Sequence, residues 1–569
     1  MQGISKTDRE LWDAGEVTGH LLPPGSVFAF LAGHRRELFP DSFIADLFTS
    51  GTGRPSLSAD LVGSVLVLQA LFDLSDGQAA DALRFDLRWK AACGRSLLAG
   101  GFDPSTLVYW RKRIARSGQP DRVFDAVARL IEETGVLRGK RRRCVDSTVF
   151  DDAVATQDTV TLITAAMRKV ARVVPGAGEV IAAVCGLDYS RPGKPQIDWD
   201  DPAAKQQLVS DLVNDALAVL AALTGEDAPE REEAEADALG LLALVAGQDV
   251  EPAEGSDGTD GRWRIARKVA PDRVISTVDR QARHTRKSKS KRRDGFRGHL
   301  AAEPETGLIT DAQMTMATGP GSSDAENGVT MASRDRFQRP AAQQPDGGPH
   351  DDAGASAQDD WPQDEIGPQE GAGAQRQDEP GPQAGEPGLE VYGDSAYGSG
   401  EARAEYQAGG HDTVIKPGPV RPAVPGGFTI DDFAVDEQQR TVTCPAGQVR
   451  PMSDKRTVTF GAVCAACPVR ELCTTARDGR SMTIHPHDGL LRAARAQART
   501  PEFKAAYPTR AGIERTVSRV ATQSGRRVRL RFIGAQKNHA WLRARCAGLN
   551  LRTLINAGLT RAAGTWSMG

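Results

Sequence analysis

The segment between residues 336 and 387 limits most strongly how this chain can fold. It contains the stretch PDGGPHDDAGASAQDDWPQDEIGPQEGAGAQRQDEPGPQAGEPG, in which Trp361 and Ile366 are the only large apolar residues. Such a segment cannot bury enough apolar surface to offset the conformational entropy lost on ordering. We therefore expect a disordered acidic linker over residues 336–387, with folded parts on both sides of it.

The charge of the chain is unevenly distributed around this linker. Residues 341–390 hold twelve acidic residues and one arginine, a net charge of −11, whereas the whole chain carries −4 and the remainder therefore +7. A basic folded body suits a polyanionic partner. The sequence has no run of about 18 apolar residues and no signal-peptide pattern at its start, so we expect a cytoplasmic protein with reduced cysteines and no membrane partner.

Hydrophobic periodicity divides the remaining chain. Residues 54–138 repeat apolar side chains at helical spacing and include the basic aromatic segment YWRKR (109–113), so we interpret them as a helical DNA-binding domain. A solvated helix face is the alternative for that basic segment. We expect an N-terminal arm over 1–53, a helical insertion over 157–263 and a cysteine-containing β-rich insertion over 421–487. The catalytic core would comprise 139–156, 264–335, 388–420 and 488–560.

Three acidic residues lie in settings that suit metal chemistry. Asp146 and Asp394 each interrupt or end a β-rich run and are followed by serine and small residues, and Glu514 lies in the segment YPTRAGIERTVSRV. Carboxylates on neighbouring strands can hold Mg²⁺, and two such ions about 3.5–4 Å apart stabilise phosphoryl transfer. Tyr507, Arg510 and Glu514 share one helical face by their spacing. The alternatives are a turn residue at Asp394 and a surface ion pair between Arg510 and Glu514.

Two other interpretations of the segment GDSAYGSG (393–400) fail on their motifs. A phosphate-binding loop would need a G-K-[ST] ending, and a serine nucleophile at Ser395 would need a G-x-S-x-G elbow. Neither pattern is present in the segment. A metal-binding carboxylate at Asp394 therefore remains the preferred interpretation.

The segments VDST (145–148), YGDSAYGSG (392–400) and YPTRAGIE (507–514) together resemble the DDE transposases of bacterial insertion sequences. The helical segment 54–117, the basic segment 276–310 and the late cysteines resemble the subgroup numbered eleven eighty-two. The resemblance implies an α/β fold: an RNase H-like core with a mixed five-stranded sheet and flanking helices, interrupted by insertions and preceded by an all-helical N-terminal domain.

The same resemblance implies a function. Asp146, Asp394 and Glu514 would hold two Mg²⁺ or Mn²⁺ ions, nick double-stranded DNA at the transposon ends and join the ends to target DNA. The protein would act as a homodimer assembled on DNA, in the bacterial cytoplasm at the nucleoid. Two alternatives stay open: a catalytically inactive or domesticated DNA-binding protein, and a metal-dependent nuclease without strand transfer.

Basic residues near these motifs are candidates for phosphate contacts. Nine cations fall within residues 280–297, and a second basic stretch, GRRVRLRF, covers 525–532. Binding through such residues should weaken steeply with salt. We expect DNA contacts from Arg283, Arg286, Lys287, Lys289, Lys291, Arg292, Arg293, Arg297, Tyr507, Arg510, Arg526 and Arg527.

Four cysteines form the pattern C-x19-C-x2-C-x5-C: Cys444, Cys464, Cys467 and Cys473. Four thiolates could close a tetrahedral zinc site, and the C-x2-C pair suits one. The C-x5-C spacing is not a standard second knuckle, so reduced structural thiols and an iron–sulfur cluster remain alternatives.

Overall fold

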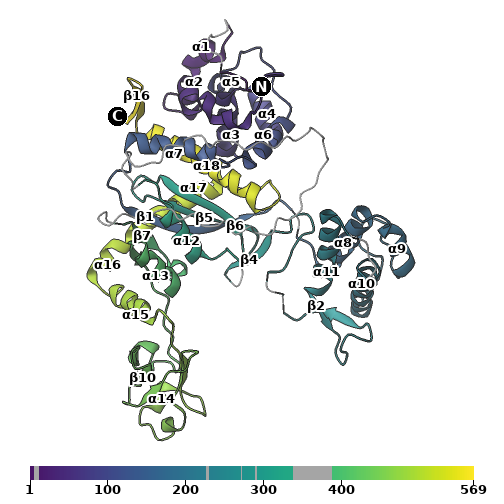
Figure 1. Cartoon of the computed structure of the whole chain (residues 1–569), viewed down its shortest axis with the longest axis vertical. Helices are drawn as coiled ribbons and strands as arrows, with labels where there is room; N and C mark the ends of the chain where they lie inside the picture. The colour runs from purple at the N-terminus through teal and green to yellow at the C-terminus, as the bar shows by residue number, and fades with distance from the viewer. Residues whose placement is uncertain are drawn as a thin grey trace.

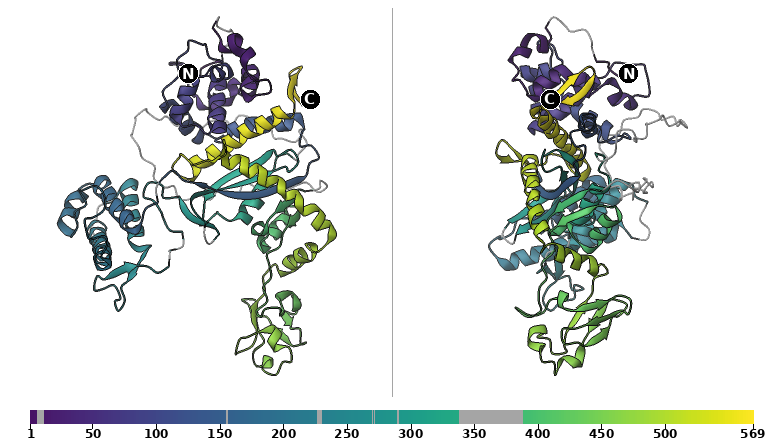
Figure 2. Two further views of the ribbon diagram at one scale, coloured as in Figure 1. Left: turned by 180° about the vertical axis from the view of Figure 1, so that it is seen from behind. Right: turned by 90° about the vertical axis from the view of Figure 1, so that its left-hand side faces the viewer.

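The computed structural model describes residues 1–5, 12–154, 156–225, 230–268, 270, 272–288, 291–337 and 388–569. Figure 1 shows a central sheet with a helical region above it, a helical lobe to one side and a small β-rich lobe below. The two lobes stand away from the sheet in the rear view of Figure 2 as well. No helix in the described part of the chain is long and apolar enough to cross a membrane.

The N-terminal region is built from helices whose starts follow their capping residues. The Ser75 hydroxyl accepts a hydrogen bond from the Gln78 amide, and the Gln78 side chain accepts one from the Ser75 amide, which is a complete capping box. The elements are α1 (Ala14–Thr18), η1 (Gly19–Leu21), α2 (Val27–Leu38), η2 (Asp41–Leu47), α3 (Ala59–Phe72), α4 (Asp76–Phe85), α5 (Leu87–Ala92), α6 (Ser105–Ala115) and α7 (Arg122–Thr134).

Residues 12–53 differ from the arm expected there. Helix α2 packs against α3 and α5, and its residues Phe30, Leu31 and Leu38 are buried in the main core. Apolar side chains on this segment would be exposed if it were a separate arm, and burying them favours the packed arrangement. The segment is therefore continuous with the helical region that follows.

The central sheet is mixed and has six strands rather than the expected five. Its strands are β1 (Arg142–Asp151), β4 (Arg283–Ser288), β5 (Lys291–Ala302), β6 (Ile309–Met316), β7 (Glu390–Gly393) and β8 (Asp412–Ile415). The order is β4-β5-β1-β7-β8, with β6 also paired to β5. Strand β5 is antiparallel to β1, β4 and β6, whereas β1-β7 and β7-β8 are parallel.

The additional strand comes from the basic segment. Residues 283–288 and 291–295 pair as an antiparallel hairpin, and Gly295 pairs with both Arg283 and Asp151. Strands β4 and β6 therefore follow one another along the same edge of β5. The segment RVISTVD (273–279), expected as a strand, contributes only the isolated bridge between Val274 and Arg283.

Helices cover both faces of the sheet. One face carries α17 (Ala511–Ala521) and α18 (Ala535–Asn556), which contact β1, β5 and β6. The other face carries α12 (Asp324–Ser333) and α13 (Gly400–Ala408). These two helices contact each other, and α12 also contacts β1 and β5. Successive side chains of a strand point to opposite faces of the sheet, and β5 shows this. A Cβ at Gly298 would lie 3.4 Å from Leu542 of α18 on one face, whereas Arg297 and His299 contact Asp324 of α12 on the other.

A buried arginine joins the N-terminal helices to this layer. Arg545 of α18 is fully buried, and its guanidinium donates to the carbonyl oxygens of Ala70 in α3, Val520 in α17 and Thr522 just after α17. Carbonyl groups at helix C-termini have no partner within the helix. One charged side chain therefore satisfies the ends of two helices that lie about 450 residues apart in the chain.

The two insertions each have their own core. The helical lobe contains α8 (Thr159–Val173), α9 (Ala177–Val184), α10 (Pro202–Leu223), α11 (Glu233–Gly247), β2 (Val250–Pro252) and β3 (Trp263–Ile265). The lower lobe contains η5 (Ile430–Asp432), β9 (Ala434–Asp436), β10 (Thr441–Thr443), β11 (Val449–Pro451), β12 (Thr457–Thr459), η6 (Gly461–Cys464), α14 (Arg470–Cys473) and β13 (Ser481–Thr483). The elements of the helical lobe span residues 159–265 and those of the lower lobe 430–483, and the insertions were expected over 157–263 and 421–487.

The chain closes with helices and two hairpins. These are α15 (Asp488–Gln497), α16 (Pro501–Ala506), η7 (Tyr507–Arg510), β14 (Thr522–Gln523), β15 (Arg526–Arg527), β16 (Leu559–Ala562) and β17 (Thr565–Met568), and η4 (Ser395–Tyr397) follows β7. Of the expected linker, residues 338–387 lie outside the described residues. Arg336 pairs with Asp125 and Glu132 of α7, and Phe337 is buried, so the folded part extends two residues further than expected.

Candidate active site

The parallel register of β1 and β7 determines where two of the carboxylates lie. Cys144 pairs with Tyr392, so two residues further along both strands Asp146 comes level with Asp394. The residue before Asp394 is a glycine in a crowded place: a Cβ at Gly393 would lie 3.0 Å from the Cβ of Tyr397, in the turn that follows the strand, and 3.3 Å from Val145 of β1. The sequence-predicted pair of aspartates is therefore adjacent in the structure.

The third carboxylate comes from the helix above β1. Ile513 and Val520 of α17 are buried against the sheet, and Glu514, in the first turn, is exposed. The preceding turn, η7, places Arg510 among the three acids. Arg510 Nη2 donates to Asp146 Oδ2 at 3.2 Å and lies 3.8 Å from Asp394 Oδ2, and Nη1 donates to Glu514 Oε1 at 3.2 Å.

The carboxylates differ in their surroundings. The side chain of Asp146 is 19% exposed, that of Asp394 44% and that of Glu514 63%. Burial raises the pKa of Asp146, and the neighbouring Asp394 acts in the same direction, whereas the Ser147 amide and Arg510 oppose the shift. Burial lowers the affinity of Arg510 for its proton, but Asp146 and the other anions around it hold the pKa of Arg510 above its ordinary value.

The donor set fits hard divalent cations in its chemistry. Asp146, Asp394 and Glu514 all approach a single cationic group, so their oxygens converge on one region, and carboxylate oxygens are the preferred ligands of Mg²⁺ and Mn²⁺. Among the described residues, no group of three or more His, Cys, Asp or Glu side chains is placed so that it could hold a metal ion. Arg510 occupies the space between the acids.

A buried polar cluster that no sequence motif indicated lies behind Asp146, on the opposite face of the sheet. Arg297 Nη1 donates to Asp324 Oδ2 at 2.9 Å, and Nδ1 of the fully buried His299 lies 3.3 Å from Asp324 Oδ1. Burial lowers the pKa of His299. Burial acts to raise the pKa of Asp324, but His299 and Arg297 hold it below its ordinary value. The sequence signal for Asp324 is the helix-start segment SSDAE, in which Ser323 caps α12.

The expected DNA-contacting residues other than Arg510 fall into three groups. Four are engaged within the protein: Arg283 donates to two backbone carbonyls, Arg293 to the Val149 carbonyl, Arg297 to Asp324, and Tyr507 stacks on Phe503 at 5.3 Å. Arg286, Arg292, Arg526 and Arg527 are exposed, although Arg527 also donates to the Val149 carbonyl. Lys289 and the side chains of Lys287 and Lys291 lie outside the described part.

Cys444, Cys464, Cys467 and Cys473 lie together in the lower lobe, remote from the carboxylates in the chain fold (Figure 1). All eight cysteines of the protein are free thiols. The four late cysteines therefore form a separate cluster, and they contribute nothing to the carboxylate site.

Known protein families match the chain in two places. A family model described as a transposase DDE domain matches residues 443–555, and one described as a transposase domain (DUF772) matches residues 26–113. Both matches indicate a transposase. No curated protein and no solved structure matches the chain.

The transposase matches cover part of the site. The DDE domain match contains Arg510, Glu514 and the four late cysteines, whereas Asp146 and Asp394 lie outside both matched segments. The second match spans most of the helical region from α2 to α6. The structure places Asp146 and Asp394 beside the matched residues Arg510 and Glu514.

Proposed function

We propose that this protein is a DNA transposase that binds the terminal inverted repeats of its own insertion sequence, cuts DNA there and transfers the strand ends to target DNA. The observation that carries the proposal is the convergence of Asp146, Asp394 and Glu514 around Arg510. The sheet supports an RNase H-like core, because strands β6, β5, β1, β7 and β8 form a mixed sheet with the first acid on the central strand.

Each carboxylate would have a definite task in such a site. Asp146 and Asp394, level on adjacent strands, would hold two Mg²⁺ or Mn²⁺ ions together with Glu514. Bound ions of this kind stabilise the attacking and leaving oxygens of an in-line phosphoryl transfer. Arg510 would leave the carboxylates when cations bind and would then be available to pair with a DNA phosphate, which a planar guanidinium suits.

The helical region and the exposed arginines support DNA as the substrate. Arg286 and Arg292 project from the β4-β5 hairpin and Arg526 from the β14-β15 hairpin, and all three are exposed. Phosphate contacts position DNA without reading its sequence. The helical region 54–138, whose residues 54–113 belong to the second matched segment, would read the terminal repeats, and a homodimer would hold two ends together.

Cleavage of DNA that carries the terminal repeats tests the proposal. Wild-type protein with Mg²⁺ should nick such DNA, and Asp394→Asn should bind the same DNA with unchanged affinity but should not nick it. Normal cleavage by Asp394→Asn would refute the carboxylate assignment. Binding without cleavage by the wild type would favour an inactive DNA-binding protein, and nicking without joining to a second DNA would favour a nuclease.

A further inference from the structure

The lower lobe has few apolar side chains to stabilise it. Its strands are three residues long, and its buried core consists of eight residues, two of which are cysteines: Phe433, Val442, Met452, Val458, Phe460, Cys464, Cys473 and Ile484. Small folded units rarely reach stability through such a core alone and commonly rely on disulfides or a bound metal. The cysteines of this lobe are free thiols, so a disulfide does not supply the missing stability.

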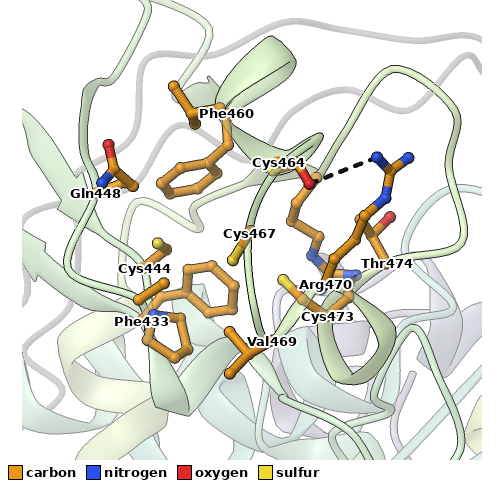
Figure 3. A pocket seen from close by; sticks show the side chains of 14 residues that line it. Phe433, Cys444, Gln448, Phe460, Cys464, Cys467, Val469, Arg470, Cys473 and Thr474 are labelled. Carbon is orange, nitrogen blue, oxygen red and sulfur yellow. Dashed lines mark hydrogen bonds between the residues drawn. The ribbon is translucent and has the colours of Figure 1, made fainter.

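The four cysteines line one small hollow. Figure 3 shows Cys444, Cys464, Cys467 and Cys473 around this space, with the ring of Phe433 among them. The cavity has a volume of about 20 Å³, which is room for one water-sized body. The four cysteines come from separate elements: Cys444 follows β10, Cys464 ends η6, Cys467 lies in the next turn and Cys473 ends α14.

Two of the cysteines are followed by similar tight turns. The Cys444 carbonyl accepts from the Gly447 amide at 2.8 Å, and the Cys464 carbonyl accepts from the Cys467 amide at 3.4 Å. Gly447 has a φ of +79°, which an L side chain rarely adopts. Tight turns after cysteine place the sulfur at the tip of a short loop, as in the knuckles of structural zinc sites. The C-x2-C spacing thus has a backbone counterpart at Cys444, where glycine stands in the second cysteine's place.

Two arginines supply charge beside the hollow. Arg470 donates to the Cys464 carbonyl at 3.5 Å, and Arg480 donates to the Cys473 carbonyl at 3.4 Å. The Nε of Arg480 is buried and has no hydrogen-bond partner among the described residues. Four thiolates around a dication carry two net negative charges, which two guanidinium groups balance.

The geometry points to a structural zinc site formed by Cys444, Cys464, Cys467 and Cys473. Among the described residues no group of three or more His, Cys, Asp or Glu side chains is placed to hold a metal ion, so the four side chains would have to rotate to bring their sulfurs from the walls of the hollow onto the ion. Each thiol gives its proton to solvent as its sulfur binds Zn²⁺, and no electron is transferred. The inference goes beyond the proposed function, since a zinc-bound lobe is compatible with an active or an inactive protein.

Metal analysis of the full-length protein tests the site. Protein purified under reducing conditions should contain about one zinc per chain, and the double variant Cys464→Ser/Cys467→Ser should lose it. Cys185→Ser is the matched control, because Cys185 lies in the helical lobe, and it should keep its zinc. Because the double variant could fail to fold, wild-type protein is also titrated with a thiol reagent. Adding a zinc chelator should expose about four further reactive thiols and lower the melting temperature.

Three results would overturn the inference. Zinc-free wild-type protein whose thiol reactivity and melting temperature are unchanged by the chelator would show reduced structural thiols instead. Stoichiometric iron with visible absorption would show an iron–sulfur cluster. If the Cys185→Ser variant loses zinc while the Cys464→Ser/Cys467→Ser variant keeps it, the metal is bound elsewhere in the protein. DNA cleavage is not part of the measurement, so failure of the cleavage experiment leaves this test valid.

Discussion

The guanidinium of Arg510 lies 3.2 Å from the carboxylate of Asp146, a residue 364 positions earlier in the chain. The same group contacts Glu514 at 3.2 Å and approaches Asp394 at 3.8 Å. One arginine therefore offsets part of the repulsion among three acids and leaves two net negative charges in the group. Replacing Arg510 therefore shows how strongly the three carboxylates repel one another.

Replacing Arg510 should make the site more dependent on divalent cations. We expect Arg510→Gln to lower the free energy of unfolding without metal by about 1–2 kcal/mol, because Asp146 is left partly buried without its partner. Mg²⁺ should then raise the melting temperature of the variant more than that of the wild type. Arg515→Gln, which changes an exposed arginine on the same helix, is the control. Equal Mg²⁺ shifts in wild type and Arg510→Gln would contradict this account.

Removing the charge of Asp146 should stabilise the protein at neutral pH. Burial raises the pKa of Asp146 in the folded state, so ionising it costs more in the folded than in the unfolded chain. The contribution of Asp146 to the free energy of unfolding is therefore lost as the pH rises above its pKa in the unfolded chain, which is about 3.9. We expect Asp146→Asn to gain on the order of 1 kcal/mol at pH 7. The gain, followed by melting temperature, should vanish below the unfolded pKa; a loss at pH 7 would refute the prediction.

Asp324 should show the opposite sign. His299 and Arg297 hold its pKa below the ordinary value despite burial, so its stabilising effect is present above the unfolded pKa and is lost as the pH falls through the folded pKa. We expect Asp324→Asn to cost about 1–3 kcal/mol at pH 7, with the difference shrinking in acid. In a double-mutant cycle with Arg297→Gln the costs should not add, because the two residues are paired. If the losses in unfolding free energy of the two single variants add up in the double variant, Asp324 and Arg297 are not energetically coupled.

The exposed arginines of the β4-β5 hairpin should govern the salt dependence of DNA binding. Arg286→Ala and Arg292→Ala should each weaken binding to any DNA sequence and reduce the slope of log affinity against log salt by about one. Arg191→Ala, at an exposed site of the helical lobe, should leave the slope unchanged. Unchanged slopes for both hairpin variants would exclude this hairpin from the DNA-binding surface. Titrations at several salt concentrations measure the effect.

Local patterns in the sequence predicted the parts of the site that depend on local structure. The helical spacing of Tyr507, Arg510 and Glu514 and the strand setting of Asp146 and Asp394 marked these residues as candidates, and the resemblance to DDE transposases grouped the three acids. The turn PETG between β5 and β6 was also predicted, because turn residues between alternating strands are a short-range signal. Apart from the resemblance, each of these signals comes from residues close to one another in the chain.

Features that depend on distant partners could not be predicted from the sequence. Arg297 and Arg293 looked like DNA contacts within a basic run, but Asp324 and the Val149 carbonyl engage them. The charge run became a strand hairpin because β5 offered it an unpaired edge. Residues 12–53 pack into the core because α5 lies next to α2 in space, a contact that periodicity in either segment does not indicate.

The buried Arg545 has a consequence for how DNA could be handled. It ties the ends of α3 and α17 to α18 through carbonyl groups that water cannot reach, so the helical region cannot swing on a hinge at residues 135–141 without breaking these bonds. A duplex gripped by the N-terminal helices would then be held at a constant offset from Asp146 and Glu514. The distance between the bound sequence and the carboxylates would then be constant, and the cut would fall a set number of base pairs from the recognised sequence.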